Sequence, residues 1–264
     1  PWEWHEELFK YAKKIGITLF SSPFDKTAVE FLEKLNNPVY KIASPELIDL
    51  ELIREVARTS KPIILSTGMA TLEEIGEAIS TARQEGCKDL IVLHCTSSYP
   101  APIEDANLST ITEIKRRFNV LSGLSDHSKG TEVSKLAAVM GASVIEKHFT
   151  IDKSKGGVDS EFSIEPDELK KLVKETQIAS SCIGNPAFQP IKSESEVLKN
   201  RRSLYIVNDL KKGDAITRKN IRSIRPGNGI LPKYINDVIG KIAIRDLKYG
   251  EPFDFSMIKS EGVN

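Results

Sequence analysis

Short, strongly apolar segments recur along the first two thirds of the chain, and they constrain its fold more than any other feature. They lie roughly 20 to 30 residues apart, and each is followed by a polar or glycine-containing turn and then by a segment of helical periodicity. Such alternation is typical of parallel sheets whose strands are covered on both faces. The pattern predicts six strands: Ile17–Ser21, Val39–Ala43, Ile63–Ser66, Leu90–Cys95, Val120–Leu124 and Ser143–His148.

Several helix boundaries between these strands carry recognisable signals. Thr71 and Glu74 have the spacing of a capping box, Pro45 stands just inside a helix start, and Gly141 ends the helical segment before it. A helix after each strand predicts an α/β fold.

Polar residues gather where the predicted strands end, as expected for a barrel whose active face collects the carboxyl ends of all strands. A doubly wound sheet is the alternative, but it often carries a GxGxxG loop, and the sequence has none. Six strands do not close an eight-stranded barrel. We therefore expect a (β/α)8 TIM barrel that lacks its first two βα units, which would precede Pro1.

A second, smaller domain is predicted after the barrel. Residues 183–200 contain Gly184, Asn185, Pro186 and Pro190 and have no clear periodicity. They are interpreted as a linker between a partial barrel at 1–182 and a β-rich domain at 201–264. In that domain the motif starting at Asp209 is echoed by the one starting at Asp246, which indicates two related hairpin-like turns. A core of this size is marginal, so we expect the domain to pack on something larger.

Composition favours a soluble cytoplasmic protein with a small-molecule partner. Basic and acidic residues balance at 37 each, so the total charge points neither to nucleic acid nor to an anionic membrane. Cys87, Cys95 and Cys182 form an odd set without CxxC spacing, which predicts reduced thiols. No apolar run has the roughly 20 residues that a membrane helix needs.

Two histidines, His127 and His148, lie at the carboxyl-terminal exits of successive predicted strands. Adjacent strands about 4.8 Å apart can bring both imidazoles to one ion, and two protein ligands leave positions open for water or a substrate oxygen. A hydrogen-bonded pair without metal is the alternative. Because side chains alternate along a strand, Glu146 shares the face of His148 and Ser125 that of His127. Glu146 is thus either a carboxylate that contacts the substrate or a salt-bridged residue at the barrel rim.

Lys41 lies in an otherwise apolar strand and must be paired with an anion, for which a phosphate or a carboxylate would serve. Ser44, Ser66 and Ser125 add hydroxyl donors at the same rim. Together they predict an oxyanion pocket without a Walker loop, although individual serines are also ordinary helix caps.

Two polar loops are further candidates. Residues 152–160 follow the last strand, where a loop can contact substrate or remain a solvated surface segment. Arg225 opens an Arg-Pro-Gly-Asn-Gly turn far from the barrel in sequence, and it combines an anion-binding side chain with a sharply turning backbone.

Seven motifs, taken together and in this order, closely resemble the sialic acid synthase family over nearly the entire chain. They are Ser21-Ser-Pro-Phe, Tyr40-Lys-Ile-Ala-Ser44, Ser66-Thr-Gly-Met-Ala70, His94-Cys-Thr, Leu124-Ser-Asp-His127, Glu146-Lys-His-Phe149 and Arg225-Pro-Gly-Asn-Gly-Ile230. The resemblance implies an N-terminal (β/α)8 barrel and a C-terminal SAF domain, also called antifreeze-like. Members condense phosphoenolpyruvate with an open-chain amino sugar or its derivative, forming a nine-carbon keto acid and releasing phosphate. Histidines that match His127 and His148 hold a metal, usually manganese or magnesium.

The resemblance also implies roles for the other candidates. Lys41, Ser44, Ser66 and Ser125 match residues at the phosphoenolpyruvate phosphate and carboxylate, and Glu146 and Asp159 match the polar sugar and catalytic surroundings.

Three more positions follow from the same resemblance. Arg225 matches an arginine that reaches the neighbouring subunit's barrel in the family's domain-swapped homodimer. Tyr99 lies in the loop on the sugar side, and Ser97 stands where sialic acid synthases commonly have asparagine, which puts that hydrogen bond in doubt.

Sequence details after the last strand favour the pseudaminic acid synthase branch. Sialic acid synthases commonly read Gly-Pro-Asp-His where this chain has Gly157-Val-Asp-Ser160, and Phe162-Ser-Ile-Glu-Pro166 follows. N-acetylneuraminate or legionaminic acid synthase is the alternative, and a noncatalytic carbohydrate-binding or assembly protein is the alternative of a different class. In the family, the first strands contribute a glutamate and a lysine to the site. Without them we expect this chain to be an inactive part of an active parent.

Overall fold

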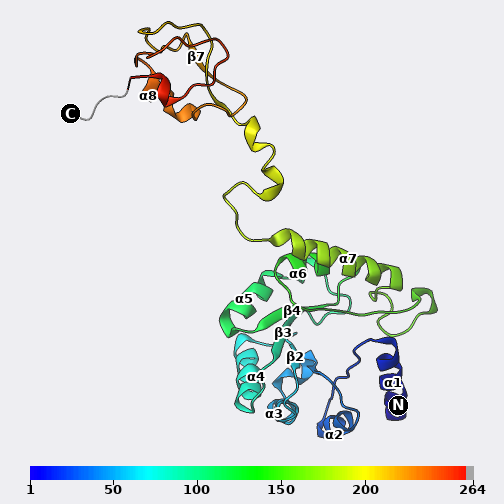
Figure 1. The fold of residues 1–264 in the computed structure, drawn as a ribbon. Helices are drawn as coiled ribbons and strands as arrows, with labels where there is room; N and C mark the ends of the chain where they lie inside the picture. Colours follow the sequence, from blue (N-terminus) through cyan, green and yellow to red (C-terminus); the bar gives the residue numbers. More distant parts are fainter. Residues whose placement is uncertain (260–264) are drawn as a thin grey trace. The chain divides into compact units, whose positions relative to one another are not determined.

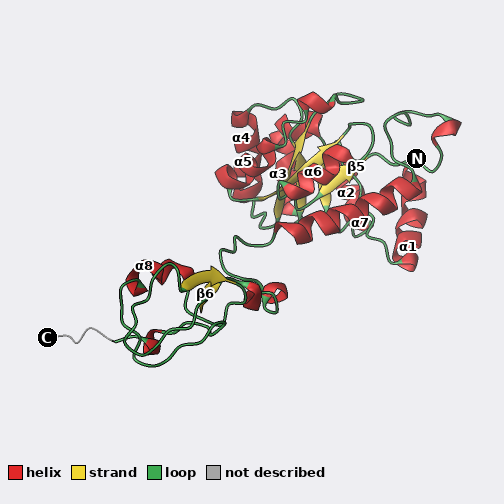
Figure 2. Ribbon diagram, turned by 90° about the horizontal axis from the view of Figure 1, so that it is seen from above, coloured by secondary structure: helices red, strands yellow, loops and turns green. Residues whose placement is uncertain are grey.

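The computed structural model describes residues 1–259, which divide into two compact units, Pro1–Gly184 and a second one from Asn185 onward (Figure 1). The first unit contains a parallel sheet in the order β1-β2-β3-β4-β5, with the helices arranged around its outside (Figures 1 and 2). Its strands are β1 (Tyr40–Ile42), β2 (Ile63–Ser66), β3 (Leu90–Cys95), β4 (Leu121–Asp126) and β5 (Ile145–Lys147). The alternation of strand and helix that the sequence predicted is confirmed.

The first predicted strand, Ile17–Ser21, is wrong: this segment forms no strand in the structure. A strand needs a neighbouring backbone ladder, and none of the described residues supplies one to this segment. The amide of Ile17 instead donates a hydrogen bond to the Ala12 carbonyl at the end of the preceding helix, and the amide of Ser21 donates to the side chain of Asn37. Apolar composition alone did not distinguish a paired strand from an extended segment.

Helices follow the strands with boundaries close to those that the sequence signals indicated. Thr71 forms the predicted capping box with Glu74, a 3-10 helix begins at Ser44 with Pro45 in its first turn, and Gly141 follows a helix end with a φ of 89°. The helices of this unit are α1 (His5–Ile15), α2 (Lys26–Lys34), α3 (Leu50–Arg58), α4 (Leu72–Gln84), α5 (Ser109–Phe118), α6 (Glu132–Val139) and α7 (Pro166–Ile183).

The main hydrophobic core lies between the outer face of the sheet and these helices. Tyr40 and Ile42 of β1 pack there with Ile63 and Leu65 of β2, and all four are fully buried. Full burial of such side chains contributes roughly 1.5–3 kcal/mol each. Because side chains alternate, the residues between them, beginning with Lys41, face the opposite, inner side of the sheet.

An ion pair between the two edge strands shows how strongly the sheet curls. Four strand spacings of about 4.8 Å would hold β1 and β5 roughly 19 Å apart in a flat sheet. Yet Lys41 Nζ of β1 lies 3.5 Å from Glu146 Oε2 of β5. The inner faces of the edge strands therefore converge, as in a barrel.

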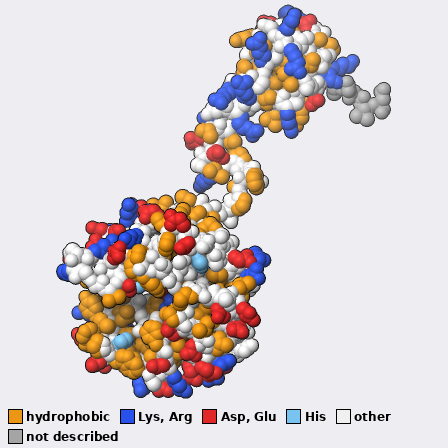
Figure 3. All heavy atoms as spheres, turned by 180° about the vertical axis from the view of Figure 1, so that it is seen from behind, with side chains coloured by type: hydrophobic (Ala, Val, Ile, Leu, Met, Phe, Trp, Pro, Cys, Tyr) orange, Lys and Arg blue, Asp and Glu red, His pale blue; other side chains and the backbone are white. Residues whose placement is uncertain are grey.

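The second unit is a small β-rich domain. β6 (Ser203–Ile206) and β7 (Ile221–Ile224) pair antiparallel over a core that includes Leu204, Ile206 and Phe253, and a four-residue helix, α8 (Ile235–Val238), follows. On the face seen in Figure 3, Lys and Arg side chains predominate over Asp and Glu. Residues 201–259 contain 13 basic and 6 acidic side chains, so the domain is cationic although the whole chain is neutral.

The two echoed motifs of this domain face each other. Leu210 and Leu247 form a backbone bridge, Lys248 Nζ lies 3.0 Å from Asp209, and Lys211 Nζ lies 2.9 Å from Asp246. The predicted relation between the two turns is thus seen as a reciprocal pair of contacts. Across the described part of the chain, no helix is long and apolar enough to cross a membrane.

Candidate active site

The inner face of the sheet carries polar side chains at the ends of all five strands. The parallel register and the alternation of side chains place them on one face: Lys41, Ser66, Cys95, Ser125 and Glu146. Lys41, Ser66 and Ser125 are buried. A buried polar surface at the carboxyl ends of parallel strands is the position of active sites in α/β barrels.

Lys41 and Glu146 form the charged centre of this surface. The Lys41 side chain is 8% exposed and the Glu146 side chain 39% exposed. The second carboxylate oxygen of Glu146 accepts a hydrogen bond of 2.6 Å from Ser125 Oγ. Lys41 therefore has a carboxylate partner within the chain, and its Nζ also donates a hydrogen bond to the Ile42 carbonyl at 3.3 Å.

A second group of hydroxyls surrounds the loop after β2. Ser44 Oγ accepts a hydrogen bond from the backbone N–H of Gly68 at 3.0 Å. A Cβ at Gly68 would lie 2.0 Å from Ser97 Oγ and 3.1 Å from Cys95 Sγ, so only glycine fits here. Ser66 Oγ is buried without a hydrogen-bond partner among the described residues. A buried unpaired hydroxyl costs about 1–3 kcal/mol, and it is therefore a candidate for hydrogen bonding to a ligand.

His127 and His148 lie side by side just beyond the last residue pair of the β4–β5 ladder. Their ring centroids are 5.1 Å apart. The backbone carbonyl of His127 accepts a hydrogen bond from the amide of Ala101, and that of His148 accepts one from the amide of Ile164. His127 Nδ1 lies 3.0 Å from the Thr96 carbonyl, and His148 Nδ1 lies 3.7 Å from Asp159 Oδ2. An oxygen acceptor at each Nδ1 favours a proton there and leaves each Nε2 lone pair available.

The two imidazoles differ electrostatically. Burial lowers the pKa of His148, and the neighbouring His127 lowers it further. Burial also acts to lower the pKa of His127, but its contacts with Cys95 and the Thr96 carbonyl outweigh burial and raise it. Burial acts to raise the pKa of the Cys95 thiol, but its hydrogen bonds with His127, Ser44 and Ser97 outweigh burial and lower that pKa.

Two aromatic side chains enclose the histidines. The Tyr99 ring lies 4.4 Å from the His127 ring, and the Phe162 ring lies 5.0 Å from the His148 ring, measured between centroids. Tyr99 is half-exposed, whereas Phe162 is buried. The aromatic side chains form an apolar wall, with the hydroxyl of Tyr99 as its polar group.

The polar loop at 152–160 brings Asp159 to this wall. Asp159 has a φ of 64°, which is uncommon for a residue with a side chain, and Ser163 fixes it by donating both its amide and its hydroxyl to the Asp159 carbonyl. The strained backbone directs the carboxylate toward His148. The loop thus contributes directly to the site.

The donor set of the histidine pair fits a divalent ion with two protein ligands. Both imidazoles present a free Nε2 from adjacent strand ends, and each opposite nitrogen faces an oxygen, as is usual for metal-binding histidines. Among the described residues, no group of three or more His, Cys, Asp and Glu side chains is arranged to hold a metal. Any ion here would depend on the two histidines and on ligands from water or substrate.

Arg225 is the one candidate that lies outside the first unit. It is exposed, and the turn that follows it is fixed by Ser203, whose hydroxyl donates to the Pro226 carbonyl and accepts from the Gly229 amide. The turn therefore holds Arg225 on a firm backbone in the second unit.

Sequence reasoning missed four residues at or beside the site: Cys95, Phe162, and Asp126 and Lys147, which form a buried ion pair. Cys95 had a detectable signal, since it ends its strand on the same alternating face as Ser66. The contacts of Phe162 depend on how the loop folds back, which no local pattern reveals.

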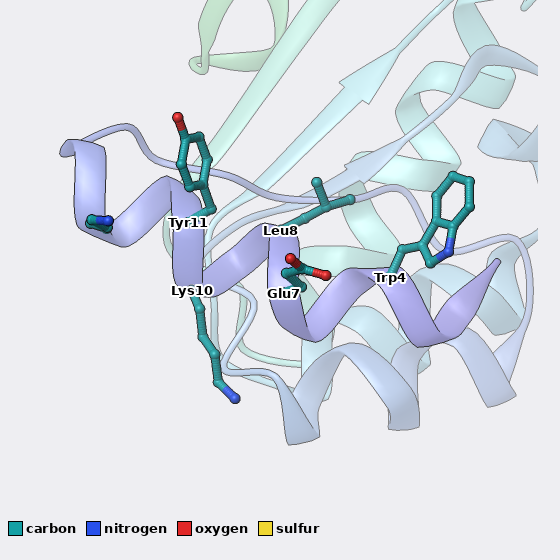
Figure 4. A pocket seen from close by; sticks show the side chains of 6 residues that line it. Trp4, Glu7, Leu8, Lys10 and Tyr11 are labelled. Atoms are coloured by element: carbon teal, nitrogen blue, oxygen red, sulfur yellow. The ribbon is translucent and has the colours of Figure 1, made fainter.

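A recess of about 620 Å³ along α1 is separate from this site. Trp4, Glu7, Leu8, Lys10, Tyr11 and Lys14 line it, all from α1 or the turn before it (Figure 4). An exposed helix face without converging polar groups lacks the features of a small-molecule site.

The fold is that of an α/β-barrel protein, and its candidate site lies at the carboxyl ends of the strands, where barrel enzymes carry their active sites. The chain belongs to the NeuB family, whose model matches residues 1–187, and the SAF domain model matches residues 201–259. The family membership and the resemblance to named synthases make the protein an enzyme.

Three relatives illustrate the similarity. Pseudaminic acid synthase of Campylobacter jejuni is 44% identical over 254 residues, covering 95% of this chain and 73% of that protein. N,N'-diacetyllegionaminic acid synthase of the same species is 39% identical, covering 94% of this chain and 75% of the relative. The crystal structure of the N-acetylneuraminic acid (sialic acid) synthetase of Leptospira borgpetersenii in complex with citrate has a TM-score of 0.72 at 37% identity, over 75% of this chain and 69% of that one.

Proposed function

We propose that the protein condenses phosphoenolpyruvate with an open-chain amino sugar derivative to form a nonulosonic acid, releasing phosphate. The observation that carries this proposal is the continuous inner face on which a buried ammonium and an unpaired hydroxyl lie beside two histidines with free Nε2 atoms. Relatives that bear the names of pseudaminic and legionaminic acid synthases support the same product class.

The anionic substrate would bind at the group around β1 and β2. Lys41 supplies the buried positive charge, and Ser44, Ser66 and Ser125 supply hydroxyls for the phosphate and carboxylate. Ser66 would gain the hydrogen-bond partner that it lacks. Glu146 balances Lys41 in the absence of an anion and stays tied to Ser125.

The acceptor aldehyde would lie at the histidine pair. A divalent ion, Mn²⁺ or Mg²⁺, held by His127 and His148 would supply Lewis-acid polarisation of the aldehyde oxygen. Tyr99 and Ser97 would contact the sugar on one side, and Asp159 would fix the His148 ring on the other. Phe162 would keep bulk water away from the reacting carbons.

In the proposed reaction the terminal carbon of the enol attacks the aldehyde carbon and forms the new carbon–carbon bond. Water adds to the enol carbon, and collapse of the resulting tetrahedral centre breaks the carbon–oxygen bond to phosphate and leaves a keto group. Glu146 would take the proton from that water, and the oxygen of the former aldehyde would take up a proton to become a hydroxyl. Holding two reactants in line can contribute about 7–11 kcal/mol, so no covalent enzyme intermediate is needed.

An amino sugar derivative that yields pseudaminic acid is the preferred acceptor, with the precursors of N-acetylneuraminate or legionaminic acid as the alternatives. The greater identity to the pseudaminic acid synthase, 44% against 39%, favours this choice.

The second unit would contribute Arg225 to the active site in the barrel of another copy of the chain. Arg225 on its fixed turn, within a domain of 13 basic and 6 acidic residues, suits an anionic substrate, and we propose a homodimer in which the SAF domains are exchanged. Light scattering would test the dimer, and mixing Arg225→Ala with Lys41→Ala chains would test exchange, because mixed dimers would regain one complete site.

Binding and turnover test the proposed function in parallel. Isothermal titration calorimetry with phosphoenolpyruvate should show binding that falls at least tenfold in Lys41→Met and that survives in Lys61→Met, a control on the outer face. This chain alone is expected to bind phosphoenolpyruvate without turnover. In the active parent, phosphate release should require both a divalent metal and a sugar, and a panel of sugars would rank the acceptors. Binding that is indifferent to Lys41 would contradict the proposal, and sugar binding without any affinity for phosphoenolpyruvate would favour a noncatalytic carbohydrate-binding protein.

A further inference from the structure

A buried ion pair lies directly behind the two histidines, on the other face of the sheet. Lys147 Nζ lies 2.9 Å from Asp126 Oδ2 and donates a second hydrogen bond to the Ser128 carbonyl at 2.5 Å. The two side chains are only 3% and 2% exposed. Asp126 and Lys147 are themselves partners in the β4–β5 ladder.

The position of this pair in the sequence links it to the site. Asp126 immediately precedes His127, and Lys147 immediately precedes His148. Alternation sends the ion pair to the outer face and both imidazoles to the inner face. The pair therefore closes the last rung of the ladder, and the histidines are the first residues beyond it.

Asp126 is also bonded to the helix that follows. Its Oδ1 accepts from the amide and hydroxyl of Ser128 at 2.9 and 2.6 Å, and its Oδ2 accepts from Ser134 of α6 at 2.5 Å. The carboxylate thus joins β4, β5 and α6 at one point. Such a buried pair adds little stability over apolar side chains of the same volume, so its presence calls for a role in fixing geometry.

We propose that the Asp126–Lys147 ion pair is a positioning device that holds His127 and His148 at the spacing needed to share one divalent ion. This inference rests on the proposed function to the extent that the histidines bind such an ion. Asp126 has a second effect, since it neutralises an ammonium that would otherwise oppose a dication on the other side of the strand.

The two partners therefore make unequal contributions. Asp126→Asn removes the tether and leaves an uncompensated positive charge behind the metal. Lys147→Met removes the tether but leaves a negative charge, which attracts a cation. A purely structural pair would show no such order in metal affinity, because each single substitution leaves one buried charge unpaired.

The experiment measures Mn²⁺ affinity by calorimetry and the visible absorption spectrum of bound Co²⁺ in the full chain. Asp126→Asn should weaken Mn²⁺ binding by roughly 100-fold and Lys147→Met by roughly 10-fold, in line with the effect of residues that orient metal ligands. The intensity of the Co²⁺ band should change in both variants as the two imidazoles lose their fixed spacing. Lys61→Met, which breaks the Lys61–Glu33 pair in the same unit, is the matched control and should leave both readouts unchanged.

If the single variants do not fold, the double variant Asp126→Asn/Lys147→Met keeps the test available, because it buries no unpaired charge. It should fold and still bind Mn²⁺ about 10-fold more weakly than the wild type. Binding within twofold of the wild type in the folded double variant, or equal losses in both folded single variants, would overturn the proposal. Failure of the proposed metal site would look different, with no Mn²⁺ binding in the wild type or unchanged binding in His127→Ala and His148→Ala.

Discussion

Removing either partner of the Lys41–Glu146 pair should have very different effects on stability. Glu146→Gln keeps the shape of the side chain and an oxygen for Ser125 but leaves the Lys41 ammonium, whose side chain is 8% exposed, without a counterion. Breaking a buried pair in this way costs about 3–5 kcal/mol. Lys41→Met leaves instead a carboxylate that is 39% exposed and still bonded to Ser125, so a cost of about 1–2 kcal/mol is expected.

Urea unfolding followed by tryptophan fluorescence measures this difference. Both tryptophans of the chain, Trp2 and Trp4, lie in the first unit, so the signal reports the unit that contains the pair. The free energy of unfolding of Glu146→Gln should lie at least about 1 kcal/mol below that of Lys41→Met, the smallest gap between the two expected costs.

An anion provides a second, independent part of the same prediction. Phosphoenolpyruvate at 100 times its Kd should stabilise a protein that binds it by about 2.7 kcal/mol. Glu146→Gln should show this gain, because its free ammonium attracts the phosphate. Lys41→Met, with at least tenfold weaker binding at the same concentration, should gain about 1.4 kcal/mol or less. Equal unfolding midpoints for the two variants, or a larger loss in Lys41→Met, would refute the reasoning.

Four further predictions concern the surroundings of this pair. Phe162→Ala should lower the free energy of unfolding by about 3–5 kcal/mol in urea titrations, since the ring is buried, whereas a loss under 1 kcal/mol would show that it is not packed as described. Gly68→Ala should cost about 1–3 kcal/mol through its clash with Ser97 and weaken phosphoenolpyruvate binding in calorimetry. Gly76→Ala in α4, where a Cβ would meet only Phe118 at an ordinary contact distance of 3.6 Å, should be neutral or stabilising; the reverse order would contradict the close packing around Gly68. Asp159→Asn should weaken Mn²⁺ binding about 10-fold by calorimetry, and unchanged affinity would remove Asp159 from the site. Mn²⁺ affinity should also fall as the pH is lowered through the pKa of His127, which its contacts with Cys95 and the Thr96 carbonyl raise, because protons then compete with the ion for this imidazole; an affinity that does not change with pH would exclude that histidine as a ligand.

The sequence was sufficient for the layout of the site because its residues obey local rules. Period-two alternation at the strand ends places Lys41 and Glu146 on one face, and the order of the strands brings His127 beside His148. The capping box at Thr71 likewise depends on four consecutive residues. These features do not require knowledge of distant contacts.

Other features depend on contacts between distant segments and could not be predicted in this way. Ile17–Ser21 has the composition of a strand but no ladder to join, and composition does not reveal the neighbour. The contact between Lys41 and Glu146 needs the curl of the whole sheet, and the wall formed by Phe162 needs the return of a loop. Asp126 and Lys147 lie in the motifs that contain His127 and His148, but their ion pair depends on the register of the β4–β5 ladder, which the sequence does not specify.

The central claim is that His127 and His148 hold one divalent ion beside a phosphoenolpyruvate pocket. Electron paramagnetic resonance of Mn²⁺ titrated with the protein measures this directly, because bound and free Mn²⁺ give separate signals. The account predicts one bound ion per chain in the wild type, loss of that ion in His127→Ala and in His148→Ala, and a change in the bound signal when phosphoenolpyruvate is added. Full Mn²⁺ binding in a folded variant that lacks both imidazoles would contradict it.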